Sequence, residues 1–146
     1  MQINIKLLSN YAKIPTKAHI GDAGFDLYSS SPTNHWPTDT ILPFEIRKIP
    51  IDIALEIPEG YFGLICDRSS LGMSGVKVMG GVIDSTYRGN VYVCLLNSST
   101  EPYHIKHGSK VAQLLILPVP IVHFIEVNEL TKTDREKKGF GSTNVF

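Results

Sequence analysis

Residues 49–58 read Ile-Pro-Ile-Asp-Ile-Ala-Leu-Glu-Ile-Pro, and this stretch decides the fold class. Its large aliphatic residues occupy every second position. Side chains on a strand point to opposite faces in turn, so this period predicts a half-buried β-strand. Pro50 and Pro58 cannot donate a ladder hydrogen bond, which places the stretch at a sheet edge or at a bulge. An exposed edge invites pairing, so a partner subunit could cover it.

The same pattern recurs on both sides of this stretch. Residues 2–7 also alternate between polar and aliphatic side chains, and Val, Ile and aromatic residues fill the other apolar runs. Glycine and proline separate these runs, and only residues 69–74 fit a helix, of one or two turns. We therefore expect an all-β fold, specifically a sandwich, jelly roll or barrel. The further expected strands are residues 62–66, 76–79, 91–96, 111–117 and 121–127.

Composition limits the classes of partner. The chain has 146 residues, 42% of them hydrophobic and 19% charged, which fits one globular domain. The formal net charge is zero, so no general affinity for nucleic acid or anionic membranes is expected. Polar residues and prolines interrupt the longest apolar run, residues 111–125, so we expect no membrane span. The first residues contain no apolar signal segment, and we expect a cytoplasmic protein.

Two cysteines, Cys66 and Cys94, lie in apolar runs. We interpret them as small buried apolar residues, with a disulfide between them as the alternative, and their spacing does not suggest a zinc site. The composition changes near Thr131. We therefore expect a single β domain over residues 1–130 and a flexible C-terminal arm over residues 131–146.

The segment with the richest chemistry lies between two expected strands. Its two leading glycines permit close backbone approach to a ligand, and its backbone groups could pair with the edge of a flat heterocycle. Asp84 could act as a general base and Tyr87 could pack on a sugar. An ordinary hairpin, with Asp84 accepting from turn N–H groups, is the alternative. The segment reads Gly80-Gly81-Val82-Ile83-Asp84-Ser85-Thr86-Tyr87-Arg88-Gly89-Asn90-Val91.

This segment resembles the third motif of the trimeric dUTPases, Gly-Val-Ile-Asp-x-x-Tyr-Arg-Gly. The resemblance implies that Gly81, Val82 and Ile83 recognise uracil through their backbone. It also implies that Asp84 deprotonates the attacking water and that Tyr87 blocks a ribose 2′-hydroxyl. Many family members carry Asp where this chain has Thr86, a position outside the catalytic set.

Three further segments resemble the first, second and fourth motifs of that family. Residues 23–27 supply Asp26 near the phosphates. Residues 68–72 supply phosphate-binding groups from Arg68, Ser69 and Ser70, and a short helix starting there would add its N-terminal dipole. Residues 108–113 supply Gln113 as a phosphate donor. The second motif departs from the family at Asp67, where proline is usual, and at Ser70, where glycine is usual.

Residues 135–143 resemble the fifth motif, a flexible arm that closes over the nucleotide. The resemblance implies that Arg135 grips the phosphates and that Phe140 stacks on uracil. Glu136 and Lys138 replace two glycines of the family pattern, which removes backbone freedom from the arm. The remaining implied triphosphate-binding residues are Gly141, Ser142 and Thr143.

The five motifs together imply a jelly-roll-like fold and hydrolysis of dUTP to dUMP and pyrophosphate. This reaction removes dUTP from the nucleotide pool and supplies dUMP for thymidylate synthesis. Family sites are assembled from three subunits, so a homotrimer is implied. Mg²⁺ is also implied, held mainly by the substrate phosphates and water rather than by protein carboxylates.

Two other functions remain open from the sequence. A dCTP deaminase of the same superfamily shares the segment Arg68-Ser69-Ser70-Leu71, but requires a Glu where this chain has Cys94. Deaminases also lack the Gly-Phe-Gly-Ser-Thr segment of the arm. A catalytically weak or regulatory nucleotide-binding member of the fold is the second alternative. The retained Asp84 and Tyr87 argue against it, and the altered arm leaves it open.

Overall fold

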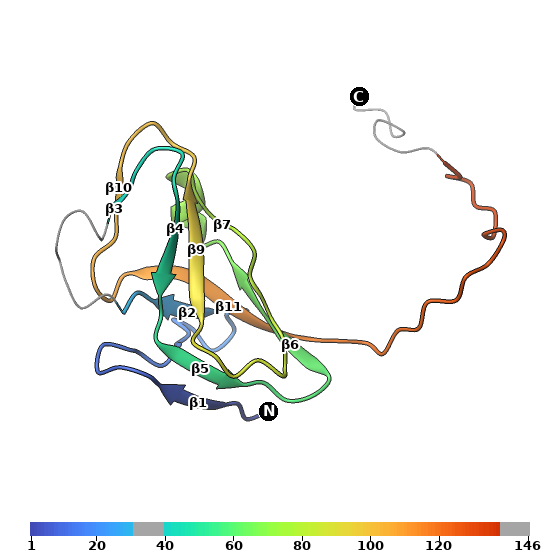
Figure 1. The fold of residues 1–146 in the computed structure, drawn as a ribbon, viewed down its shortest axis with the longest axis horizontal. Coiled ribbons are helices and arrows are strands. Elements are labelled where there is room, and N and C mark those ends of the chain that lie inside the picture. Colours follow the sequence, from blue (N-terminus) through green and yellow to red (C-terminus); the bar gives the residue numbers. More distant parts are fainter. Residues whose placement is uncertain (31–39, 138–146) are drawn as a thin grey trace.

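The computed structural model describes residues 1–30 and 40–137, and it is built almost wholly of short strands (Figure 1). The single helix of the described residues is too short to cross a membrane. The elements are β1 (Asn4–Leu7), β2 (Phe25–Tyr28), β3 (Thr40–Ile41), β4 (Ile46–Pro50), β5 (Ile53–Glu56), β6 (Tyr61–Cys66), α1 (Ser69–Met73), β7 (Val76–Val78), β8 (Val82–Ile83), β9 (Tyr92–Asn97), β10 (Tyr103–His104) and β11 (Lys110–Pro118). The all-β prediction and the short helix at 69–74 are confirmed.

The larger sheet has the strand order β2-β11-β6-β8. Strand β11 runs antiparallel to both neighbours, and Gln113 lies opposite Asp26 on one side and Cys66 on the other. This register brings three distant parts of the chain together at one end of the sheet. The loop that follows β6 carries Arg68 into the same region.

The second sheet has the order β4-β9-β7, and β4 forms its edge, as the prolines predicted. The alternating stretch 49–58 is not one strand, however. It changes sheet at Asp52, which has a left-handed φ of 54°, and continues as β5, which pairs with β1. A period of two is preserved across this bend, so the alternation alone did not reveal the break.

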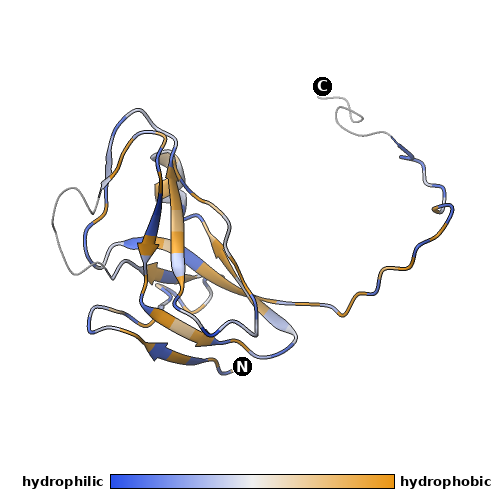
Figure 2. Ribbon diagram, in the orientation of Figure 1, coloured by the Kyte–Doolittle hydropathy of each residue, from blue (hydrophilic) through white to orange (hydrophobic). Residues whose placement is uncertain are grey.

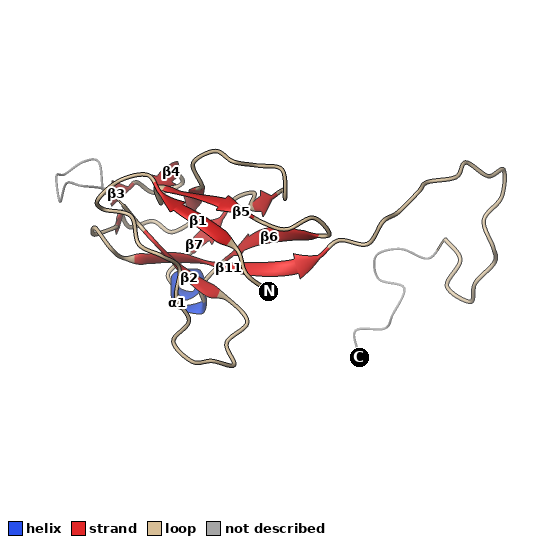
Figure 3. Ribbon diagram, turned by 90° about the horizontal axis from the view of Figure 1, so that it is seen from below, coloured by secondary structure: helices blue, strands red, loops and turns tan. Residues whose placement is uncertain are grey.

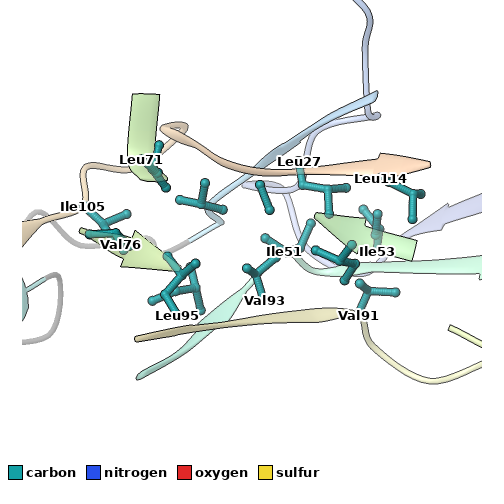
Figure 4. Close-up of a cluster of buried hydrophobic side chains, with 14 of the residues drawn as sticks. Leu27, Ile51, Ile53, Leu71, Val76, Val91, Val93, Leu95, Ile105 and Leu114 are labelled. Carbon is teal, nitrogen blue, oxygen red and sulfur yellow. The ribbon is translucent and has the colours of Figure 1, made fainter. Parts of the chain in front are cut away.

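The hydrophobic core lies between the strand layers (Figure 4). Leu27 and Leu114 come from the larger sheet, and Val93 and Leu95 come from β9. Side chains of the alternating stretch, including Ile51 and Ile53, fill the space between them. Two facing layers of this kind fit the expected jelly-roll-like architecture.

The cysteines differ in part from the expectation. Cys66 and Cys94 are both free, so the alternative of a disulfide between them is wrong. Each is half-buried rather than fully buried, because Cys66 ends β6 and Cys94 lies on the face of β9 opposite the buried Val93 and Leu95. Their interpretation as small residues in strands is otherwise confirmed.

The chain leaves the domain after β11. Residues 119–137 extend away from the body in both views (Figures 1 and 3). Apolar and polar residues follow one another along this segment (Figure 2), and Phe124 is 98% exposed. The predicted strand at 121–127 is therefore wrong for the single chain, because a strand needs a neighbouring backbone and this segment lies beside none.

Candidate active site

The segment between β7 and β9 opens into a pocket because its two arms diverge. The pairing of β7 with β9 reaches Val78 opposite Leu95, and the Met79 N–H donates to the Cys94 carbonyl at 2.8 Å. The chain then turns away, and β8 pairs with β6 on the larger sheet. The expected hairpin is thus split between two sheets, with a pocket of about 370 Å³ in the gap.

Two glycines make this divergence possible. Gly80 and Gly81 have φ values of 83° and 123°, which residues with a Cβ rarely adopt. The Gly81 carbonyl accepts from the Ile65 N–H at 2.8 Å. A Cβ at position 81 would lie 2.6 Å from the Ile65 carbonyl oxygen, so only glycine fits this approach.

The pocket presents backbone edges rather than many polar side chains. Val82 and Ile83 pair with β6 on their outer side, and Tyr92 and Val93 pair with β4 on theirs. Their inner edges face the gap, where N–H and C=O groups can pair with a planar base. The lining consists of Ile65, Val78, Met79, Gly80, Gly81, Val82, Ile83, Asp84, Tyr87, Asn90, Val91, Tyr92, Val93 and Cys94.

Asp84 and Tyr87 lie at the mouth of this pocket, as the sequence predicted. Both are exposed, and the Tyr87 N–H donates to the Asp84 carbonyl at 3.1 Å. Within residues 1–30 and 40–137, no side chain forms a hydrogen bond or ion pair with the Asp84 carboxylate. The carboxylate is therefore available to accept a proton from water.

A second pocket, of about 300 Å³, is strongly polar and centres on Asp26. Arg68 Nε donates to Asp26 Oδ1 at 2.9 Å, and Lys110 Nζ lies 2.7 Å from Asp26 Oδ2. The hydrogen bond with Asp26 raises the pKa of Lys110 above its ordinary value. Asp22 also lines this pocket, so its charged side chains sum to zero, and Arg68 and Lys110 offer charged donors to phosphate oxygens without a net positive excess.

Gln113 also lines this pocket, and its orientation is fixed. Its Nε2 donates to the Asp67 carbonyl at 2.8 Å, and Gly24 packs so closely on its side chain that a Cβ there would collide with it. The Asp67 side chain points away from Arg68. Its Oδ1 accepts from the Val78 N–H at 2.5 Å, and Oδ2 lies 3.6 Å from Lys77 Nζ.

Ser69 and Ser70 begin α1 beside the same pocket. Arg68 is the N-cap residue and has extended dihedral angles, and no side chain caps this helix end. The carbonyl of Arg68 accepts from the Leu71 and Gly72 N–H groups. Among the described residues, only the N–H groups of Ser69 and Ser70 are left without an acceptor at this helix end, and an anion could accept from them.

Arg135 lies in the extended segment, away from both pockets. Glu136 beside it has a φ of 46°, a conformation that glycine adopts without strain, and glycine is the family residue at this position. Its side chain and backbone close a local turn with Thr133. The other predicted arm residues, Phe140, Gly141, Ser142 and Thr143, lie outside the described residues.

The two pockets share no lining residue. Within one chain, the pocket lined by Asp84, called the base pocket below, is therefore separate from the polar pocket around Asp26. Sequence reasoning gave Lys110 no role of its own, although it occupies the basic position of the fourth motif. The signal that could have identified Lys110 is its position three residues before Gln113 in the same strand, because Gln113 pairs with Asp26 on the neighbouring strand.

Comparisons with known proteins agree with this arrangement. The dUTPase family model matches residues 10–144. The chain is 37% identical over 146 residues to the deoxyuridine 5′-triphosphate nucleotidohydrolase of Gloeobacter violaceus, covering 98% of this chain and 97% of that protein. It is 39% identical over 137 residues to the cowpox virus protein of the same name, covering 94% and 89%.

Solved structures point the same way. The Staphylococcus bacteriophage 80alpha dUTPase with dUpNHpp superposes with a TM-score of 0.88 at 29% identity, covering 99% of each chain. A point mutant of the dUTPase from phage phi11 of S. aureus, described with a coordinated structural Mg(II) ion, gives a TM-score of 0.80 at 27% identity, covering 90% of this chain and 100% of that one. With a family model over most of its length and relatives of this similarity, the chain belongs to the dUTPase family.

Proposed function

We propose that this chain hydrolyses dUTP to dUMP and pyrophosphate by attack of an Asp84-activated water on the α-phosphorus. The observation that carries this assignment is the split hairpin, which opens a base-sized pocket and places an accessible carboxylate at its mouth. In this step the water oxygen bonds to the α-phosphorus and its proton passes to Asp84. The bond from the α-phosphorus to the bridging oxygen breaks, and that oxygen leaves with pyrophosphate.

The inner backbone edges support recognition of uracil. Val82 and Ile83 on one arm and Tyr92 on the other offer fixed donors and acceptors across the gap. Uracil and cytosine present different donor and acceptor patterns on their pairing edges, so a rigid backbone frame distinguishes them. Tyr87 lies beside Asp84 at the mouth, where it would pack on the deoxyribose.

The polar pocket supports binding of the triphosphate. Arg68, Lys110 and Gln113 gather there with the N-terminal end of α1. Catalysis of phosphoryl transfer rests mainly on positioning and on neutralising charge as the bond breaks. Arg135 and the arm residues Phe140, Gly141, Ser142 and Thr143 would complete this environment when the arm closes over the nucleotide.

Mg²⁺ fits this site as a partner of the substrate. Within the described residues, no group of three or more His, Cys, Asp or Glu side chains is placed to hold a metal ion. Of the two carboxylates that line the polar pocket, Asp26 is paired with Arg68 and Lys110, and Asp22 accepts from the His19 N–H. The donors here suit phosphate oxygens, so the ion would be held by the phosphates and water, where it neutralises charge and orders the triphosphate.

A homotrimer with shared sites would unite the two pockets. Asp84 belongs to one pocket and Arg68 to the other, and no lining residue is common to both. The extended segment after β11 exposes large apolar side chains, including Ile121 and Phe124, which a neighbouring subunit would cover. We therefore place the base pocket, the polar pocket and the closing arm of each site on three different chains.

The deaminase alternative is weaker in the structure as well. Cys94 lines the base pocket at the position where a deaminase requires Glu. The carboxylate that would perform the proton transfers on cytosine is absent from that position. The regulatory alternative predicts nucleotide binding without turnover, and the accessible Asp84 argues against it.

One set of assays tests both dUTP as the substrate and Asp84 as the general base. Wild type with Mg²⁺ should release pyrophosphate from dUTP and no ammonia from dCTP. Asp84→Asn should lower kcat by about 10²- to 10⁴-fold, the usual contribution of a general base, with binding of a nonhydrolysable dUTP analogue retained. Glu59→Gln, on an exposed turn, serves as the matched control and should match wild type. Ammonia from dCTP, or full turnover in Asp84→Asn, would refute the proposal.

A further inference from the structure

The Tyr87 ring is held by contacts within its own turn. Its hydroxyl donates to the backbone carbonyl of Asn90 at 2.9 Å. Gly89 lies against the ring, and a Cβ there would come within 2.5 Å of the Tyr87 hydroxyl oxygen. Tyr87 is 43% exposed, and among the described residues its hydroxyl forms no other hydrogen bond. The position of the ring therefore depends on where the Asn90 backbone lies.

The side chain of Asn90 is anchored in turn by Asp52. Asn90 Nδ2 donates to Asp52 Oδ1 at 3.0 Å and to the Tyr92 hydroxyl at 3.3 Å. A carboxylate can only accept, so the pairing fixes which end of the amide faces Asp52. Asn90 Oδ1 is left buried with no hydrogen-bond partner among the described residues. An orphaned acceptor is costly, which shows how firmly Asp52 imposes this orientation.

Asp52 is itself fixed by an unusual backbone. It has a left-handed φ of 54° at the bend between β4 and β5, and its carbonyl accepts from the Leu8 N–H at 2.8 Å. This bend lies beside the start of β9 (Figure 1), where Pro50 pairs with Tyr92. Burial pushes the pKa of Asp52 up, but hydrogen bonds led by that from Asn90 outweigh it and lower the pKa, so the carboxylate stays ionised.

We infer that Asp52 and Asn90 form a brace that positions the Tyr87 ring and thereby sets the preference for deoxyribose over ribose nucleotides. The inference rests on the proposed function, since it concerns the sugar of the same substrate. Asp52 and Asn90 are positioning residues, because they act through Tyr87. Strained residues such as Asp52 are retained where the surrounding structure needs their geometry.

Loss of the brace should change the selectivity between dUTP and UTP. Without it the Tyr87 ring can move aside and admit a 2′-hydroxyl, while the base pocket and Asp84 keep their places. We expect kcat for dUTP to stay within about twofold of wild type. The ratio of kcat/KM for dUTP to that for UTP should fall about five- to tenfold, which corresponds to one lost hydrogen bond.

Three variants at two positions separate the side-chain contact from the backbone strain. Asp52→Gly removes the acceptor and accepts the left-handed φ, so the chain should fold and selectivity should fall. Asp52→Asn keeps an acceptor and is among the residues that tolerate this φ, so it should preserve selectivity. Phe44→Gly is the matched control, because Phe44 also has a left-handed φ, 61°, in a turn remote from the pocket. It should leave the selectivity ratio unchanged.

A double-mutant cycle tests whether the brace acts through the Tyr87 hydroxyl. Tyr87→Phe alone should lower the selectivity ratio as Asp52→Gly does, and the double variant should lower it no further. Additive losses, or a wild-type ratio in Asp52→Gly, would overturn the inference. The failure of the underlying function looks different, since wild type would then release no pyrophosphate from dUTP.

Discussion

At the residue scale, the base pocket depends on glycines more than on reactive side chains. Gly80 and Gly81 turn the chain from one sheet to the other, and Gly81 touches the backbone of β6. Asp84 gains its place because the residues before it are bound to β6. The chemistry of the aspartate is ordinary, and its location at a pocket mouth makes it useful.

Replacement of Gly81 by alanine should damage this arrangement. The new Cβ would meet the Ile65 carbonyl, and alanine rarely adopts a φ of 123°. We expect a loss of stability of about 1–3 kcal/mol and a severe loss of dUTP turnover. Gly21→Ala is the control, since Gly21 has an ordinary φ and open space around it. Urea unfolding and a pyrophosphate assay of both variants check this, and a fully active Gly81→Ala would contradict it.

Single residues also show the limits of sequence reasoning. The family resemblance named Asp84, Tyr87, Asp26, Arg68 and Gln113; the structure places them in two pockets, and their roles stay predictions. The brace at Asp52 could not be predicted, because a left-handed φ at a non-glycine residue leaves no pattern in the sequence. The role of Lys110 depends on the register that places β11 beside β2.

At the element scale, hydrogen bonds to loop side chains tie the two sheets together. Asp67 follows β6 and accepts from the backbone of β7, so one hydrogen bond joins the loop after β6 to the strand that leads into the split hairpin. The family usually has proline at this position. Here the aspartate turns away from Arg68 and stabilises the neighbouring strand instead.

Asp67→Ala should therefore destabilise the fold by about 1 kcal/mol, the value of one net hydrogen bond. The Val78 N–H would lose its acceptor. Lys77→Ala is a suitable control, because the 3.6 Å contact of Lys77 with Asp67 is exposed and contributes little. Chemical unfolding of both variants tests the difference. Equal stabilities would show that the hydrogen bond is unimportant.

Elements were predictable where a local pattern determines them. Alternation located β1, β5 and the end of β4, and apolar runs located β6, β7, β9 and β11, whereas β2, β3, β8 and β10 were not expected. The segment after Arg68 formed the expected short helix. Two errors have physical causes. The bend at Asp52 preserves the period of two, and the apolar run 121–127 has strand-like composition but no neighbouring backbone among residues 1–30 and 40–137.

At the scale of the whole molecule, the single chain looks incomplete. Its extended segment exposes Ile121, Phe124 and Ile125, the last at 82%. A chain of 16.2 kDa gains little from exposing such side chains unless another subunit covers them. The separation of the two pockets gives the same indication from the chemistry.

Two truncations separate assembly from arm closure. A chain ending at residue 130 should remain a trimer and keep its stability, but lose about a hundredfold in kcat/KM because the arm no longer orders the nucleotide. A chain ending at residue 118 should also lose the trimer. Sedimentation should give three times 16.2 kDa for the full chain, and three times its own smaller chain mass for the first truncation. A trimer in the second truncation would contradict the role given to residues 119–130.

The most direct test of the central claim is dUTP hydrolysis in ¹⁸O-labelled water, followed by mass spectrometry of the products. Attack of water on the α-phosphorus predicts one ¹⁸O in dUMP and none in pyrophosphate. Asp84→Asn should form neither product at an appreciable rate. Label in pyrophosphate, or release of dUDP and orthophosphate, would contradict the account.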